Sequence, residues 1–266
     1  MSEEPAWDSR LLTIDGVELA TRSWLFDGDA HAIVVLVHGL SSTKDHPNVV
    51  ALASKMKDRG IDVISYDARG HGASGGFSTL GDLERNDVAA AVTRARSRNG
   101  RVALVGASMG AIASLSYAQT DPDLAGVVVV SSPADWRVPL RVRALLTVVL
   151  ARTKPGRLIA ARRARVRIHP VWNPPEPPQS VAKRVVTAVP LAIVHGRRDR
   201  LIPFQSSLSV SITEVPGAHA VVVSGMGHAF DPVGHDAICD ALDWVLSTSG
   251  TTEEQTKSGA ILGRST

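Results

Sequence analysis

The sequence predicts an α/β fold, in which a mostly parallel sheet is covered by helices on both faces and carries one basic insertion. Apolar runs of strand length alternate with segments of helical periodicity along most of the 266 residues. The alternation stops at residue 134 and resumes after residue 185. No internal repeat divides the chain, so we expect one core, formed by residues 1–133 and 186–246, with residues 134–185 spliced into it.

The strands are predicted from short apolar runs, which are typical of strands covered on both faces. They occupy residues 17–26, 32–37, 61–66, 101–105, 125–130, 191–194 and 220–223. The helices are predicted where apolar residues recur at spacings of three and four. They occupy residues 47–59, 82–98, 109–119, 204–211 and 233–246. This order indicates right-handed crossovers between parallel strands.

The charge of the chain is concentrated in the insertion. The whole sequence has a net charge of +3, but residues 134–185 hold twelve basic and two acidic residues, which leaves an acidic remainder. This overall charge is too small to indicate a nucleic acid as partner. Three interpretations of the insertion stay open: an amphipathic cap that contacts acyl chains or an anionic membrane surface, a site for phosphates of an acidic substrate, or a solvated face paired with the acidic body.

The sequence argues against a secretory signal and against a membrane-spanning segment. The N-terminus is acidic and lacks a basic segment followed by an apolar run, and no apolar stretch is long enough to cross a bilayer. We therefore expect a cytoplasmic protein. Residues 247–266 are rich in Ser, Thr and Gly and are predicted to form a disordered tail. Cys239, the single cysteine, is expected at a buried helix position.

Two segments fit the pattern G-x-S-x-G, residues 106–110 and residues 72–76. Ser108 directly follows a predicted strand and opens a predicted helix, which is the setting that a nucleophile elbow requires, whereas Ser74 has no such setting. The glycines suit a strained turn because side chains at Gly106 and Gly110 would collide with the neighbouring strand and helix. Ser108 is therefore the candidate nucleophile.

A serine hydroxyl needs a histidine to accept its proton and a carboxylate to orient that histidine. His228 lies in a glycine-rich loop between the last strand and the last helix, and Asp199 lies just beyond the carboxyl end of a strand. These residues give the chain order Ser108, Asp199, His228, which is the order that accompanies a nucleophile elbow. Asp135, which follows the preceding strand, is the alternative acid. The other histidines that we considered are expected to be structural: His38, His71, His195, His219 and His235.

The oxyanion donors are expected to be backbone amides. The N–H of Met109 lies at the start of the helix after Ser108, where the helix dipole favours negative charge. The loop after residues 32–37 permits close backbone approach at Gly39, which makes the N–H of Leu40 the second candidate.

Together, these segments and the loop of residues 66–74 resemble the α/β-hydrolase superfamily, especially its lid-bearing esterases and monoacylglycerol lipase-like serine hydrolases. The resemblance covers residues 11–246 and implies a mostly parallel eight-stranded sheet, an acyl-enzyme mechanism, and a lid in the place of the insertion. It implies a structural role for residues 67–74 and no metal or organic cofactor. A serine at the elbow argues against the branches that use an aspartate nucleophile.

The leading hypothesis is a serine hydrolase that cleaves a small-molecule carboxylic ester with an apolar acyl group. Hydrolysis of a thioester or an amide passes through a similar tetrahedral intermediate and stays open as an alternative. Two alternatives belong to other classes: a catalytically silent binding protein, and a peripheral membrane adaptor that acts through the basic insertion. The sequence leaves the substrate and the oligomeric state undetermined.

Overall fold

The computed structural model describes residues 10–136, 153–211 and 217–262. Its main feature is a seven-stranded sheet with the order β3-β5-β4-β6-β7-β8-β9, in which only β3 runs antiparallel to its neighbour. The strands are β3 (Thr21–Trp24), β4 (Ala32–Val37), β5 (Ile61–Tyr66), β6 (Val102–Ala107), β7 (Gly126–Val130), β8 (Leu191–Gly196) and β9 (Ala218–Val223). The mostly parallel sheet confirms the predicted fold class.

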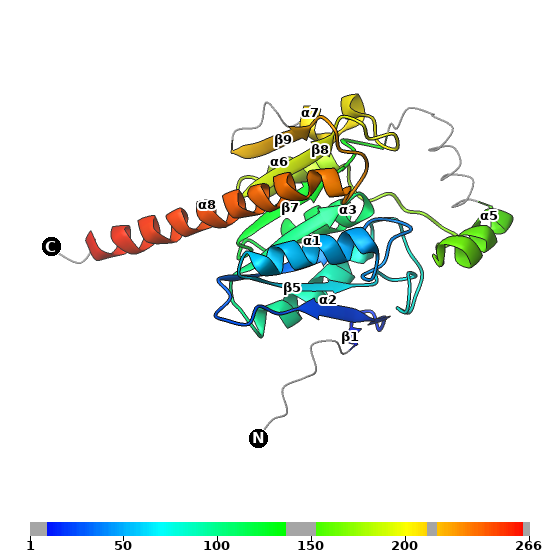
Figure 1. Ribbon diagram of the computed structural model, residues 1–266, viewed down its shortest axis with the longest axis horizontal. Coiled ribbons are helices and arrows are strands. Elements are labelled where there is room, and N and C mark those ends of the chain that lie inside the picture. Colours follow the sequence, from blue (N-terminus) through cyan, green and yellow to red (C-terminus); the bar gives the residue numbers. More distant parts are fainter. Residues whose placement is uncertain (1–9, 137–152, 212–216, 263–266) are drawn as a thin grey trace, which may run out of the picture.

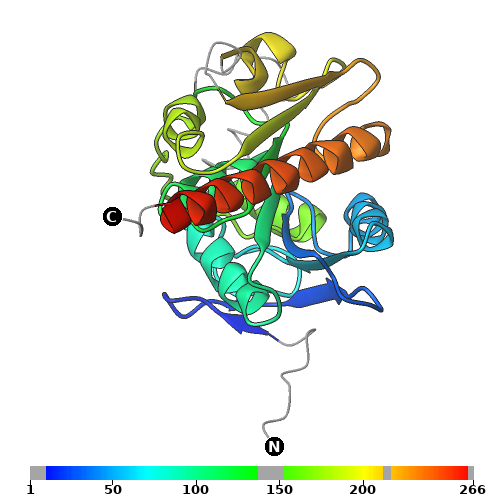
Figure 2. The same cartoon turned by 90° about the vertical axis from the view of Figure 1, so that its left-hand side faces the viewer.

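Helices cover both faces of the sheet, because alternate side chains of each buried strand point to opposite faces. On one face, α2 (Glu84–Arg96), α3 (Met109–Ala118) and α6 (Pro178–Val185) pack over Ile33, Val35 and their neighbours. On the other face, α1 (Pro47–Asp58) and the first turns of α8 (His235–Leu262) pack over Val34, Leu36 and their neighbours. Figures 1 and 2 show the sheet between these two layers. Cys239 is fully buried in α8, as predicted.

The sheet has one strand fewer than the eight that we expected. The predicted strand at residues 17–26 is divided into β2 (Glu18–Leu19) and β3, and β2 pairs with β1 (Leu11–Leu12) in a separate two-stranded sheet. The chain turns away from the main sheet at Ala20, whose N–H donates to Ser74 Oγ and whose carbonyl accepts from the N–H of Asp67. Those bonds to a loop replace the ladder bonds that a continuous strand would make.

The end of the chain also differs from its prediction. Residues 247–262, expected to be a disordered tail, continue α8 as helix, and no proline interrupts them. Figure 1 shows these last turns extending past the sheet. The predicted helix at residues 204–211 is a 3-10 turn, η2 (Phe204–Ser206), followed by the short α7 (Leu208–Ser211).

The insertion is only partly within the described residues, since 137–152 lie outside them. Its described helical parts are α5 (Lys154–Ile159) and a π-helical turn, η1 (Ala160–Ala164). Helix α6, which we assigned to the insertion, packs through Val181, Ala182 and Val185 into the core beside α3, because those residues form one apolar face. The inserted segment therefore ends before Pro178. The N–H of Gln179 donates to the carbonyl of Ala134, so the two ends of the segment lie next to each other.

Candidate active site

Ser108 occupies a sharp turn between β6 and α3. Its backbone has φ 54° and ψ −114°, a combination that non-glycine residues avoid because it brings Cβ close to the backbone. The turn is held by the N–H of Ser108, which donates to the carbonyl of Val130 at 2.9 Å. The side chain is half-buried at the carboxyl edge of the parallel strands. A strained serine in this position has the geometry of a nucleophile elbow.

Three glycines allow the turn to form. An added Cβ at Gly106 would lie 2.5 Å from the carbonyl oxygen of Gly110, and one at Gly110 would lie 2.3 Å from the carbonyl oxygen of Val37. A Cβ at Gly39 would lie 3.2 Å from Cβ of Ser108. The loop after β4 therefore passes directly beside the serine, and the two segments approach more closely than side chains would permit.

We expect Gly110→Ala to damage the site while Gly100→Ala leaves it intact. The new Cβ at Gly110 must push β4 and the 38–40 loop away from the serine, whereas Gly100 has no atom within 4 Å of such a Cβ. A displacement of about 1 Å at reacting groups costs on the order of 100-fold in rate. Ester turnover and thermal unfolding of the two variants measure this, and equal activities would contradict the packing argument.

Asp199 and His228 form a close pair. Nδ1 of His228 donates to Oδ2 of Asp199 at 2.7 Å, and the other oxygen of Asp199 accepts from the N–H groups of Leu201 and Ile202 at 2.8 Å each. Burial alone would raise the pKa of the Asp199 carboxyl, but the hydrogen bonds from His228 and from these two amides outweigh burial and lower it. Asp199 therefore stays ionised and faces a half-buried imidazole.

The loop that carries His228 is held against β8 by its backbone. Gly196 ends β8 so close to this loop that an added Cβ would lie 2.3 Å from the carbonyl oxygen of Met226. The N–H of Arg198 donates to the same carbonyl, and the N–H of Gly227 donates to Asp231 Oδ2 at 3.0 Å. These contacts connect the Asp199 loop and the His228 loop before any ligand binds.

A cavity of about 260 Å³ lies beside His228. It is lined by Gly39, Ser42, His46, Asn48, Val49, His228, Ala229 and Phe230. Since Gly39 borders both this cavity and Ser108, the structure brings the elbow, the Asp199–His228 pair and the Leu40 loop to one place. The polar lining from Ser42, His46 and Asn48 was not foreseen, because nothing in the sequence indicated which face of the 41–49 segment would turn toward the histidine.

The two candidate oxyanion amides belong to residues that directly follow Gly39 and Ser108 in the chain. In the part of the chain that the structure describes, the N–H groups of Leu40 and Met109 donate no hydrogen bond to another protein group. Leu40 follows Gly39, and Met109 is the first residue of α3. Both amides are therefore available to a ligand beside Ser108, and the start of α3 adds a partial positive charge.

The other candidate residues have structural partners. Ser74 Oγ donates to the carbonyl of Asp67 at 2.6 Å and accepts from Ala20, so its hydroxyl is occupied. His38 donates through Nδ1 to the carbonyl of Gly39 and accepts at Nε2 from the N–H of Ala68, and burial lowers its pKa to about 3. His38 is therefore uncharged, and its two hydrogen bonds stabilise the loop beside Ser108.

The remaining histidines also have local partners. Nε2 of His195 bonds to the carbonyl of Ile202, Nε2 of His235 bonds to the carbonyl of Phe230, and His219 stacks on Trp244. His71 bonds through Nδ1 to the carbonyl of Arg69 and meets the ring of His38 edge-on. Among the described residues, Asp199 is the carboxylate that is hydrogen-bonded to His228. The alternative acid, Asp135, is not the partner in that bond.

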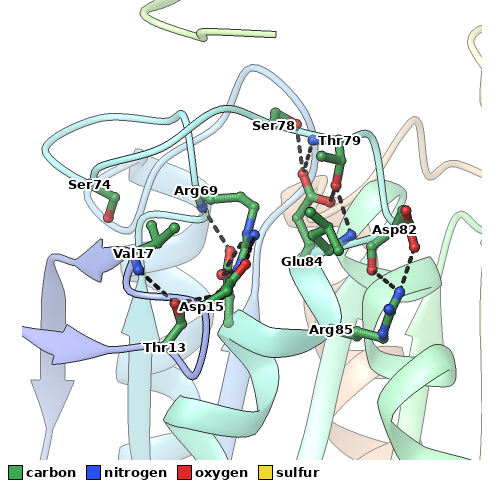
Figure 3. Close-up of polar contacts among 12 residues, drawn as sticks. Thr13, Asp15, Val17, Arg69, Ser74, Ser78, Thr79, Asp82, Glu84 and Arg85 are labelled. Atoms are coloured by element: carbon green, nitrogen blue, oxygen red, sulfur yellow. Dashed lines mark hydrogen bonds and ion pairs between the residues drawn. The ribbon is translucent and has the colours of Figure 1, made fainter. Parts of the chain in front are cut away.

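The loop after β5 is supported by a buried polar network, shown in Figure 3. Arg69 donates to Asp15 at 2.7 Å and to Asp87 at 2.9 Å. Glu84, at the start of α2, accepts from the hydroxyl of Ser78 and from the backbone and hydroxyl of Thr79. Buried charges paired in this way fix the loop rigidly, which agrees with the structural role expected for residues 67–74.

The described insertion lies against this loop. Its backbone at residues 166–169 bonds with Gly70 and Ser78, while Ala160, Val166 and Ile168 form a small apolar cluster with Leu40 and Leu80. The insertion therefore touches the residue that carries a candidate oxyanion amide. Figure 1 places α5 on the side of the molecule where α8 begins, which is the side of the His228 loop.

No group of three or more potential metal ligands occurs among the described residues. No helix in the described ranges is long and apolar enough to span a membrane.

Comparisons with known proteins agree with this geometry. Residues 28–180 match the model of a family described as serine aminopeptidase, S33. A monoacylglycerol lipase from Mycolicibacterium smegmatis is 28% identical over 278 residues, which cover 88% of this chain and 95% of that protein.

Solved structures share the fold. An esterase from Pyrococcus furiosus is 20% identical with a TM-score of 0.66, and the match covers 90% of each chain. An esterase from Thermogutta terrifontis is 21% identical with a TM-score of 0.61, covering 89% of this chain and 98% of its own. At these identities the likeness concerns the architecture of the chain.

Proposed function

The chain belongs to the serine aminopeptidase family S33 of α/β-hydrolases, and from this membership we propose that it hydrolyses carboxylic esters with Ser108 as nucleophile, His228 as general base and Asp199 as the orienting carboxylate. The observation that carries the proposal is the Asp199–His228 hydrogen bond of 2.7 Å beside the cavity that Gly39 shares with the Ser108 elbow. The printed names of its relatives, a lipase and two esterases, favour an ester as substrate.

The proposed reaction has two halves. Ser108 Oγ attacks the ester carbonyl while His228 accepts the hydroxyl proton, and the N–H groups of Leu40 and Met109 bind the resulting oxyanion. The imidazolium then protonates the departing alcohol, which leaves an acyl-enzyme. Water, deprotonated by His228, attacks the acyl carbon. The bond from that carbon to Ser108 Oγ then breaks, His228 returns the proton to Oγ, and the carboxylic acid is released.

Asp199 has two roles in the proposed reaction. It holds the proton on Nδ1 of His228, so that Nε2 is free to accept from Ser108, and its charge stabilises the imidazolium. Its lowered pKa keeps it ionised throughout. The bonds from the Leu201 and Ile202 amides occupy the second carboxylate oxygen and prevent the carboxylate from rotating away.

The substrate class is proposed from the surroundings of the site. The partly exposed Leu40 and Leu80 offer apolar contacts to an acyl chain, whereas Ser42, His46 and Asn48 offer polar groups to the alcohol. A p-nitrophenyl ester series of increasing acyl length tests this, with an acyl-CoA and an aminoacyl p-nitroanilide as thioester and amide competitors. The proposal fails in favour of a peptidase if the anilide is the substrate with the highest kcat/KM.

The competing hypothesis from another functional class is a catalytically silent binding protein. It would have no need for the strained backbone of Ser108, which costs about 1–3 kcal/mol and persists where it serves a mechanism. The amides of Leu40 and Met109 beside it, which no described residue engages, argue in the same direction.

The basic insertion is proposed to contact an anionic lipid surface. Within its described part, the stretch of residues 153–171 contains six basic residues and no acidic residue. Leu158 and Ile159 are about half exposed, at 52% and 51%, and exposed arginines follow at positions 162, 163 and 165. Exposed apolar side chains among cations suit a bilayer interface better than a soluble phosphate does.

We expect the triple variant Arg162→Gln, Arg163→Gln, Arg165→Gln to bind phosphatidylglycerol vesicles on the order of 100-fold more weakly, since each basic residue near such a surface contributes about 1 kcal/mol. The matched control loses the same charge elsewhere, through Lys55→Gln, Lys57→Gln and Arg85→Gln, three ion-paired residues of α1 and α2. Flotation of both proteins at two salt concentrations makes the comparison. Equal loss in the two variants would mean that only net charge matters.

A further inference from the structure

The end of β7 contacts every segment that carries a proposed catalytic residue. The carbonyl of Val130 accepts from the N–H of Ser108 at 2.9 Å. The N–H of the next residue, Ser131, donates at 3.0 Å to the carbonyl of Val194 in β8, the strand that leads to Asp199. The hydroxyl of Ser131 accepts from the N–H of Ala229, next to His228, at 3.0 Å. Two consecutive residues therefore join the elbow, the acid strand and the histidine loop.

The backbone of Ser131 is strained for a residue with a side chain. Its φ is 51°, in the left-handed region, and the side chain is fully buried. Its partner Ala229 is also left-handed, with φ 59°. Glycine would adopt such a conformation without cost, whereas other residues lose about 1 kcal/mol or more. The feature that serine has and glycine lacks here is the hydroxyl that bonds to the His228 loop.

We propose that Ser131 is a positioning residue for His228, an inference that rests on the proposed function. The imidazole of His228 makes one hydrogen bond, from Nδ1 to Asp199. The loop before it is held by the bond from Arg198 to the carbonyl of Met226. The bond from Ala229 to Ser131 fixes the backbone on the other side of the same residue. Because Ser131 is also bonded to β8, the histidine loop is fixed relative to the strand that supplies Asp199.

Loss of the Ser131 hydroxyl leaves the Ala229 amide without its acceptor and frees the loop to shift. A shift of about 1 Å at Nε2 of His228 lengthens its path to the Ser108 proton and costs on the order of 100-fold in the chemical step. Substrate binding in the adjoining pocket does not depend on that proton transfer. The effect is therefore expected in kcat, with KM little changed.

The test compares Ser131→Ala, Ser131→Gly and the neighbouring control Ser132→Ala. Ser132 is equally buried, but its hydroxyl bonds to the carbonyl of Pro133 and not to the histidine loop. The readouts are kcat and KM on a soluble p-nitrophenyl ester, the rate of fluorophosphonate reaction at Ser108, and the midpoint of thermal unfolding. Both Ser131 variants are expected to lose roughly 10- to 100-fold in kcat and in labelling rate, and Ser132→Ala is expected to keep both.

Stability separates positioning from general damage. Ser131→Gly relieves the left-handed strain that Ser131→Ala retains, so the glycine variant is expected to unfold at a higher temperature while being equally impaired in kcat. Activity that follows stability, or wild-type kcat in Ser131→Ala, would overturn the positioning role. An inactive, unlabelled wild-type protein would instead refute the proposed function, so the two failures are distinguishable.

Discussion

Replacing Ser108 or His228 by alanine is expected to lower kcat for ester hydrolysis by roughly 10⁶-fold. Ser108→Ala removes the atom that forms the acyl bond, and His228→Ala removes the base without which a hydroxyl is a poor nucleophile at neutral pH. Because the two residues act as one unit, the double variant is expected to be no worse than either single variant. Steady-state kinetics on a p-nitrophenyl ester measure all three.

The matched control is Ser74→Ala, which alters the other G-x-S-x-G segment. Ser74 bonds to Asp67 and Ala20 and takes no part in the cavity beside His228. We expect it to lose some stability and to retain turnover per folded molecule. Equal inactivation of Ser74→Ala and Ser108→Ala, with both proteins folded by circular dichroism, would invalidate the choice of nucleophile.

Asp199→Asn is expected to lower kcat by roughly 10⁴-fold with little change in KM. The asparagine keeps the shape of the side chain and an oxygen for the amides of Leu201 and Ile202, but its NH₂ cannot accept a hydrogen bond from Nδ1–H of His228 as the carboxylate oxygen does. The imidazole then takes the wrong tautomer and its charged form loses its counter-ion. The comparison with wild type is made at a pH where both are folded.

Asp135→Asn is the control for the competing acid. Asp135 follows β7 and was the alternative carboxylate, whereas the hydrogen bond to His228 comes from Asp199. We expect Asp135→Asn to retain kcat within a small factor. A larger loss in Asp135→Asn than in Asp199→Asn would transfer the role to Asp135.

The main course of the fold could be predicted from the sequence because buried parallel strands are continuous apolar runs. The strands β4, β5, β6 and β8 are each buried along their whole length, and their runs contain few polar residues. The same reasoning located Ser108, Asp199 and His228, since each follows the carboxyl end of a strand, and such ends meet at one edge of a parallel sheet.

Other features depend on contacts between distant segments and left no local pattern. The separation of β2 from β3 depends on the hydrogen bond that Ala20 accepts from the N–H of Asp67 and the one that it donates to Ser74, about fifty residues away along the chain. Helix α6 joined the core because its apolar face meets α3, whereas its basic residues had suggested the insertion. The position of Ser131 just after an apolar strand was a usable signal, but its left-handed backbone and its bond to Ala229 were not predictable from an ordinary serine in the sequence.

The most direct test of the central claim is reaction of the purified protein with a fluorophosphonate, followed by peptide mass spectrometry of the adduct. The probe phosphonylates a serine whose proton is removed by a neighbouring base, so it reports an activated hydroxyl without knowledge of the substrate. The account predicts a single adduct on Ser108 that disappears in Ser108→Ala and forms far more slowly in His228→Ala. An adduct on a different serine, or folded wild-type protein that does not react, would contradict it.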